Sequence, residues 1–453
     1  MTGAAGPADD RHPRDRLPRT LTLRDATLLV VSSVIGSGIF LTPGTIADLV
    51  PHAGLILVAW AAGGVLSLVG ALANAELGTL YPRAGGDYVY LREAFHPVAG
   101  FLVGWLTFFA IYAGTIATLA VGFAEGLGAV LGLGPAEVRA LALGVTVLTS
   151  ALNFRGVRLG ALANNLTAIL KILALLAFAA VAPFFGAVAF DRLEFTGGAV
   201  GAASLSAFGL ALSPVLFSYL GWNAPVYVAS EIRSPDRNVP RSLFYGLGLC
   251  TAVYLMVNLV YLATIPLPEL RGLPNAGESA ARAVFGPVAG TVVAAFVLLS
   301  ILGTLNATIL VGPRIAYAMA LDGLFFSGVD RIHGAYRTPG VAIVVSCVTA
   351  LGLILVLESF PNALNYTTFA IVLATIADVL ALYALRWRQP ERRRPYRALG
   401  YPWLPALYIV AHLGIAAAMV VGSPRECAIG LGVLLAGLPF YLFFVRRQPL
   451  APR

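Results

Sequence analysis

Long apolar runs, separated by short polar loops, recur along almost the whole chain of 453 residues. Each run reaches the length of about 18 or more residues that an α-helix needs to cross a membrane. The pattern predicts an all-α membrane protein with twelve transmembrane helices. We place these spans at 26–50, 52–78, 97–125, 136–154, 160–183, 201–230, 241–265, 284–318, 339–357, 362–385, 401–421 and 426–445.

The charge composition supports the membrane prediction and adds an orientation. Charged residues make up only 11% of the chain, against about 25% in a typical soluble protein. The loops fall into two alternating sets. The set that includes both tails carries 23 of the Lys and Arg residues, and the opposite set carries five. Because positive loops stay inside, the N-tail (1–22) and the C-tail (446–453) are predicted to be cytoplasmic, in a cell (inner) membrane.

Two of the predicted spans contain residues that form poor helix in mid-span. The first span carries Gly-Ser-Gly at 36–38, and each glycine costs about 1 kcal/mol relative to alanine in a helix. The sixth span places Gly221, Asn223 and Pro225 within five residues, and proline removes a helical hydrogen bond. We interpret both stretches as interruptions of the helix. The alternative is that they only permit a kink or close helix packing.

The two interruptions occupy corresponding positions in two halves of the chain. Span one starts on the cytoplasmic side and span six on the opposite side. Residues 26–183 and 201–385 are therefore predicted to be repeats of opposite orientation within a transport core over 23–385. Two additional helices follow within 401–445. Paired interrupted segments of this kind are a sequence pointer to the binding site of a transporter.

Opening a helix in mid-membrane frees main-chain groups that lipid cannot satisfy. The N–H groups of Gly38 and Ile39 would favour an anion, and the carbonyls of Val34 and Ile35 would favour a cation. Neither interrupted stretch contains a charged side chain, so the site would have to read charge through main-chain dipoles. A zwitterionic α-amino acid presents both charges close together, and it is the ligand that this pattern predicts.

Lys171 is the only lysine in the chain, and it lies near the middle of the predicted span 160–183. A charge at that depth costs about 2.5–3.5 kcal/mol on insertion scales, and the depth argues against a lysine that merely snorkels to the surface. Its ammonium would serve as a fixed counter-ion or, because lysine changes its protonation readily on burial, as the carrier of a coupled proton. The sequence leaves these two roles open.

The remaining polar residues indicate no catalytic chemistry. We find no Ser/His/Asp set, no paired carboxylates, no metal-ligand spacing and no phosphate loop. The chain is therefore predicted not to be an enzyme and to use no cofactor or metal. No basic groove with interleaved aromatic residues suggests a nucleic-acid partner. The polar residues Glu76, Arg314, Asp378 and His412, which lie within spans, are interpreted as contacts or anchors between helices.

Several segments resemble one family of membrane proteins, the amino acid–polyamine–organocation (APC) superfamily, over about residues 22–445. Val34–Phe40 resembles its first-helix signature, and Asn164–Lys171 resembles its fifth-helix stretch with a lysine. Two further segments are similar to its L-type amino acid transporter-like branch, the loop Pro82–Phe95 and the sixth-helix segment Phe217–Asn223, and Arg314–Gly323 resembles the end of the family's helix eight.

This resemblance implies a LeuT-like fold, a 5+5 inverted repeat with helices 1 and 6 broken, plus two additional helices. It implies sodium-independent transport, with Lys171 at the position of the vacated sodium ion. Phe217 would gate the site from outside, and Asn223 would lie at the substrate side chain. The substrate-binding residues that it implies are Val34, Ile35, Gly36, Ser37, Gly38, Ile39, Phe217, Ser218, Leu220, Gly221 and Asn223.

Neutral L-amino acids, moved by alternating access with proton symport or amino acid exchange, are the predicted substrates. Leu220 stands where many members of the family have a smaller residue, which would narrow the pocket. A polyamine or cationic amino acid permease is the alternative within transport, and an acidic residue on the pocket wall would favour it. A membrane receptor that binds an amino acid without moving it is the alternative from another class. Membrane lipid and a proton are the other expected partners.

Overall fold

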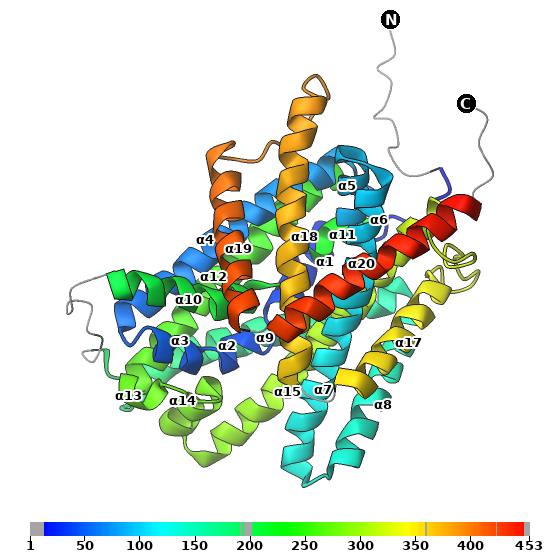
Figure 1. Cartoon of the computed structure of the whole chain (residues 1–453). Coiled ribbons are helices and arrows are strands. Elements are labelled where there is room, and N and C mark those ends of the chain that lie inside the picture. The colour runs from blue at the N-terminus through cyan, green and yellow to red at the C-terminus, as the bar shows by residue number, and fades with distance from the viewer. Residues whose placement is uncertain (1–12, 191–192, 194–201, 358–359, 423, 448–453) are drawn as a thin grey trace, which may run out of the picture.

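The computed structural model describes residues 13–190, 193, 202–357, 360–422 and 424–447. The start of the predicted N-tail, the end of the C-tail and Arg192 of a predicted outer loop lie outside the described residues. Within the described ranges the chain folds into helices joined by loops (Figure 1). Its isolated parallel bridge joins Leu21 to Ile232.

Nine helices of the described chain are long and apolar enough to cross a membrane, or ten if one bent pair counts as a single span. Two shorter apolar helices, α10 (Ala202–Tyr219) and α17 (Gly340–Leu357), lie where the sixth and ninth spans were predicted. The nine spans are α4 (Ala53–Leu80), α6 (Pro97–Leu106) continued through the π-helical η1 (Thr107–Tyr112) into α7 (Ala113–Leu131), α8 (Pro135–Phe154), α9 (Val157–Val181) with η2 (Ala182–Phe184), α12 (Pro235–Thr264), α15 (Pro287–Val311) with α16 (Pro313–Leu321), α18 (Phe360–Arg388), α19 (Trp403–Gly422) and α20 (Pro424–Arg447).

The helices differ in how deeply they are packed. In the span formed by α6 and α7, 83% of the apolar window is buried inside the protein, against 22% in α9, α19 and α20. The outer helices therefore present exposed Leu, Val and Phe side chains along much of their length. So much exposed apolar surface indicates helices that face lipid, around an inner set of helices that face one another.

The first transmembrane segment is interrupted after its first half. Helix α1 (Leu23–Val34) begins with a capping box between Thr22 and Asp25, which satisfies two of its free N–H groups. Residues 35–37 leave the helical path, and the chain resumes as α2 (Gly38–Leu41) and α3 (Pro43–Leu49). The two halves meet at an angle of 43°.

A second interruption follows α10. The chain turns over residues 220–223, where Gly221 has a φ of +99°, a conformation that glycine adopts at little cost. Helix α11 (Ala224–Tyr227) then starts with Pro225, whose missing N–H is not needed in a first helical turn. The short turn η4 (Ala229–Glu231) leads from there into α12.

The two ends of the molecule carry different elements. The end of α20 and the helix α5 (Asp87–Ala94) lie toward one end, and the short helices α13 (Leu267–Leu270) and α14 (Ala276–Phe285) lie toward the other (Figure 1). The described start of the N-tail, in dark blue, approaches the end that carries α5. Both described chain ends therefore lie on the same side of the helix bundle.

Buried ion pairs join helices that are distant in sequence. Arg314 of α16 holds Glu231 through two hydrogen bonds, of which the shorter is 2.8 Å, and both side chains are almost fully buried. Arg386 of α18 donates from Nε to Glu76 of α4 at 3.0 Å. His412 instead contacts the carbonyl of Tyr408 within its own helix, at 3.0 Å.

Candidate functional site

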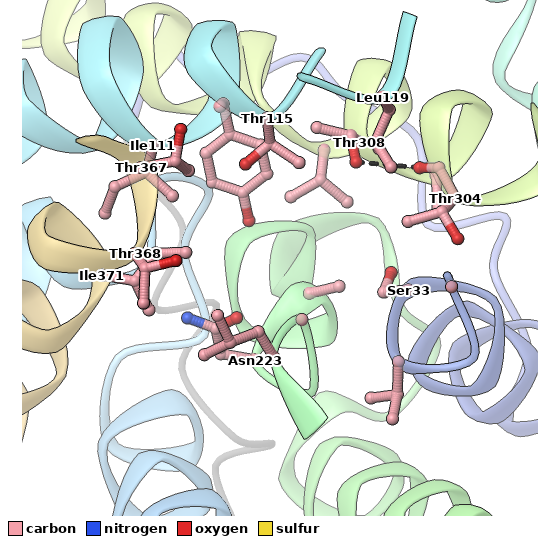
Figure 2. A pocket seen from close by; sticks show the side chains of 18 of the residues that line it. Ser33, Ile111, Thr115, Leu119, Asn223, Thr304, Thr308, Thr367, Thr368 and Ile371 are labelled. Carbon is pink, nitrogen blue, oxygen red and sulfur yellow. Dashed lines mark hydrogen bonds between the residues drawn. The ribbon is translucent and has the colours of Figure 1, made fainter. Parts of the chain in front are cut away.

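A cavity of about 130 Å³ lies where the two interrupted segments meet the inner helices. Side chains from α1, η1, α7, α15 and α18 converge on it together with Asn223 of the second interruption (Figure 2). Most of the wall is apolar, with hydroxyl groups at intervals, as is common for a small-molecule site.

Most residues that the sequence assigned to the substrate lie on the cavity wall. Ile35 and Ile39 are the two that do not, and their side chains are fully buried in the surrounding packing. The residues on the wall are Val34, Gly36, Ser37, Gly38, Phe217, Ser218, Leu220, Gly221 and Asn223.

The two interruptions touch each other through their glycines. A Cβ atom on Gly38 would lie 2.5 Å from the Ser218 hydroxyl oxygen and 2.8 Å from its Cα. A Cβ atom on Gly221 would lie 2.9 Å from both Cβ and the carbonyl oxygen of Ser33. Glycine is needed at these two positions because any side chain would force the interrupted segments apart.

The carbonyls freed in the first interruption already have donors from other helices. Tyr254 of α12 donates its hydroxyl to the carbonyl of Val34 at 2.8 Å and lies 3.0 Å from the carbonyl of Ser218 in the second segment. Ser300 of α15 contacts the carbonyl of Ile35 at 3.0 Å. These bonds fix the shape of the opening, as required of non-helical backbone at membrane depth.

Lys171 supplies the cation at this place. Its ammonium lies 3.0 Å from the carbonyl of Ser32, 2.6 Å from that of Ile35 and 3.0 Å from the hydroxyl of Thr304. An ammonium has three N–H donors, and each of them meets one of these oxygens. Three oxygens around this nitrogen are compatible with both roles that the sequence left open, a fixed counter-ion and the carrier of a coupled proton. A Cβ atom on Gly303 would lie 3.0 Å from Lys171 Cε, so the site has no spare room.

The main-chain N–H groups that follow the first interruption, unlike its carbonyls, begin a new helix. The N–H groups of Phe40 and Leu41 donate to the carbonyl of Ser37, which makes Ser37 the start of the new helical turn. Gly38 and Ile39 therefore sit where helical N–H groups lack an intrahelical partner. Such amides at a helix start attract negative charge.

Hydroxyl residues form much of the wall that sequence reasoning missed. They come from three helices, at spacings of three residues in α7, four in α15 and one and seven in α18, and a helix brings residues three, four or seven apart to the same face. That periodic threonine pattern within apolar spans was the signal available in the sequence. The members are Thr115 and Thr118 of α7, Thr304 and Thr308 of α15, and Thr367, Thr368 and Thr375 of α18. Figure 2 labels all of them except Thr118 and Thr375.

A π-helical turn contributes two further residues of the wall. Ile111 and Tyr112 lie in η1, where the chain of the third span is wound more loosely than in an α-helix. Single π-turns within α-helices are frequently found at functional sites. Composition does not reveal such a turn, so the sequence carried no signal for it.

An acidic residue also reaches the cavity, from outside the two interrupted segments. Asp87 is the first residue of α5, and its carboxyl accepts a hydrogen bond from the Tyr227 hydroxyl. Gly86 permits this approach, because it has a φ of +49° and a Cβ there would lie 2.5 Å from the Tyr227 ring. The sequence indicated no paired carboxylates, whereas the fold brings Asp378 near Asp87. The two lie far apart in sequence, so no local spacing showed the pair.

The arrangement of main-chain groups, hydroxyls and a fixed ammonium around a small cavity defines a membrane protein that binds a small polar molecule. The chain belongs to the amino acid permease family of the APC superfamily, which it matches over residues 21–438. The family match covers the interrupted segments, Lys171 and Asp87.

Named relatives are similar to this chain over nearly its whole length. It is 30% identical to the serine/threonine exchanger SteT of Bacillus subtilis, over 96% of this chain and 99% of that protein. It is 29% identical to the human b(0,+)-type amino acid transporter 1, over 96% and 91% of the two chains. It is 30% identical to the large neutral amino acids transporter small subunit 2 of the rat, over 95% and 82%. These relatives are transporters, not enzymes.

Proposed function

We propose that this protein is a sodium-independent secondary transporter of neutral L-amino acids that works by alternating access. One observation carries the proposal: a small cavity lies between two interrupted segments, and the protein's own ammonium occupies the carbonyls that would otherwise attract a metal cation. The names of two relatives, a serine/threonine exchanger and a large neutral amino acids transporter, support the same substrate class and favour exchange.

The proposed architecture is LeuT-like. The nine long spans, the bent pair and the two shorter helices α10 and α17 together make twelve. We assign residues 26–183 and 201–385 to two inverted repeats, and 401–445 to two additional helices. Both chain ends would be cytoplasmic in a cell membrane, as the distribution of Lys and Arg favours.

In the proposed complex each charged group of the substrate meets main-chain atoms. The carboxylate would accept from the amides of Gly38 and Ile39. The ammonium would donate to carbonyls of the second interruption, such as those of Ser218 and Leu220. Asn223 would contact the substrate side chain, and Phe217 would close the cavity from outside. Because such groups are already in place, little ordering of the site is needed on binding.

A cationic amino acid is the second candidate substrate, because Asp87 lies on the cavity wall. A carboxylate there would attract a positively charged side chain. Two features argue against a cationic substrate: Tyr227 already donates to Asp87, and Asp378 lies near the same carboxyl. Neutral substrates therefore remain our first proposal.

Transport by the purified full-length chain tests the proposal. Proteoliposomes loaded with an unlabelled amino acid should exchange it for the same labelled compound, in sodium buffer and equally in choline buffer. A panel of neutral, cationic and acidic amino acids would rank the substrates. Saturable binding without any exchange would indicate a receptor, and an inactive panel with no binding would refute the assignment.

A pair of glycine variants tests where the substrate binds. Gly38→Ala should lower substrate affinity and exchange by more than about tenfold, because its methyl group meets Ser218 at 2.5 Å and wedges the two segments apart. Gly209→Ala, in α10, is the matched control, since nothing lies within 4 Å of the added methyl group. If the two variants have equal activity, the substrate does not bind between the two interrupted segments.

A further inference from the structure

Two carboxyl groups from distant parts of the chain meet beside the cavity. Asp87 begins α5 and Asp378 lies in the middle of α18, and their buried side chains lie close enough to influence each other. Asp87 is 1% exposed and Asp378 is fully buried. Two neighbouring buried carboxylates repel each other and neither has a hydrogen to donate, so one proton shared between them would relieve the pair.

The surroundings offer the pair too few donors to remain doubly charged. Tyr227 donates to Oδ2 of Asp87, and the Thr107 hydroxyl is 3.5 Å from the same atom. In the described chain, Oδ1 of Asp87 and both oxygens of Asp378 have no hydrogen-bond donor. The fully buried amide of Asn74 interacts with Asp378 but does not reach hydrogen-bond geometry.

The titratable groups that face the pair are tyrosines. They come from α5, η1, α11 and α19, the elements packed around the two carboxyls, and each is uncharged at neutral pH. Among the described residues neither carboxyl has an ion-pair partner, so a proton is the charge that neutralises the pair. The four tyrosines are Tyr90, Tyr112, Tyr227 and Tyr408.

A short chain of contacts joins this pair to the cavity. Asn223, on the cavity wall, lies 3.2 Å from the Tyr227 hydroxyl, and that hydroxyl donates to Asp87. Asp87 itself also lines the cavity. Asn223 is therefore two hydrogen bonds away from Asp87, and the charge on the pair acts on a substrate in the cavity.

We propose that Asp87 and Asp378 form a proton-binding site that is linked to amino acid binding. The pair holds one proton, shared in an O–H···O bond between the two carboxyl groups, and the cavity binds its amino acid only while this proton is present. Loss of the proton leaves two neighbouring carboxylates, which repel each other and put a second negative charge at the wall of the cavity that holds the substrate. The inference rests on the proposed function, because it concerns the affinity for the transported amino acid.

Equilibrium binding of the best amino acid from the panel, measured from about pH 5 to about pH 9, tests this link. Above the pH at which the pair releases its proton, the Kd of the wild type should rise by up to tenfold per pH unit, the slope for one linked proton. Asp378→Asn should bind with a Kd that changes less than about twofold over the same range. The amide keeps the net charge of the singly protonated pair and donates to Asp87 in place of the shared proton.

Infrared difference spectra of the same samples give a readout that does not depend on transport. The wild type should show the carbonyl band of a protonated carboxylic acid that disappears at high pH, and Asp378→Asn and Asp87→Asn should each lack it. Asp48→Asn, at an exposed carboxylate in α3, is the matched control and should keep both the band and the wild-type pH profile.

Several outcomes would overturn the proposal. A wild-type Kd that stays constant with pH would do so, as would an Asp378→Asn variant with the wild-type slope. Failure of both asparagine variants to fold would also contradict it, because an amide mimics the protonated acid. If the asparagine variants lose only the binding of cationic amino acids and keep the wild-type pH profile, the pair selects the charge of the substrate and does not bind a linked proton. If no amino acid binds at any pH, it is the proposed function that fails.

Discussion

The cavity is flanked by two buried ionic sites whose hydrogen-bonding partners differ. At Lys171 one positive charge meets three oxygen atoms, one for each N–H of the ammonium. At Asp87 and Asp378 two acids meet fewer donors than their oxygens can accept. A buried charge whose hydrogen bonds are all satisfied is stable as a fixed part of the structure. A buried carboxyl pair that lacks hydrogen-bond donors is stabilised when it takes up a proton or a ligand. In our proposal the comparison therefore separates a structural ion at Lys171 from a proton-binding site at Asp87 and Asp378.

Removing the ammonium should have the largest effect. In Lys171→Ala the carbonyls of Ser32 and Ile35 lose their donor within the membrane, at a cost of about 3 kcal/mol or more. We expect exchange to fall by at least about 100-fold in proteoliposomes. Lys171→Arg should not restore it fully, because a planar guanidinium needs more space than the close approach of Gly303 leaves. Exchange at the wild-type rate in both variants would show that transport does not need the Lys171 ammonium.

Removing one of the three acceptors should have an intermediate effect. Thr304→Val keeps the shape of the side chain but leaves the ammonium with two oxygens, which should cost about 1–2 kcal/mol of stability and about tenfold in exchange. Thermal unfolding in detergent and exchange at fixed pH measure these losses. Thr308→Val is the control, since it also lines the cavity but bonds to the carbonyl of Thr304 instead of to Lys171. Equal losses in the two variants would mean that the third acceptor contributes nothing special.

Removing one donor from the acidic pair should have the smallest effect. A hydrogen bond to a carboxylate favours its charged form, so Tyr227→Phe should make the pair hold its proton to higher pH. We expect the pH at which substrate affinity begins to fall to move upward by less than about one unit. Tyr112→Phe changes a neighbouring ring, with centroids 5.3 Å apart, and serves as the control. A downward shift in Tyr227→Phe would contradict the assignment of the proton to this pair.

Local patterns explain which features of the fold were accessible from the sequence. Apolar runs of membrane length, and glycine or proline within them, act through the chain's own geometry, so they predicted an all-helical membrane protein. Nine or ten of the twelve predicted spans meet the criteria of length and composition, and α10 and α17 fall short in the described residues. The burial of Lys171 at mid-membrane was also predictable, because a lysine in the middle of an apolar run costs free energy unless protein groups surround it.

What the sequence determined by itself was the class of the protein and the places where its helices are weak. The tertiary structure alone decided which groups meet at those places: Tyr254 and Ser300 on the freed carbonyls, threonines on three inner faces, and Asp87 against Asp378. The physical reason is the range of the interactions. Helix formation and membrane insertion depend on residues a few positions apart, whereas the partners of a buried polar group come from whichever helices pack against it.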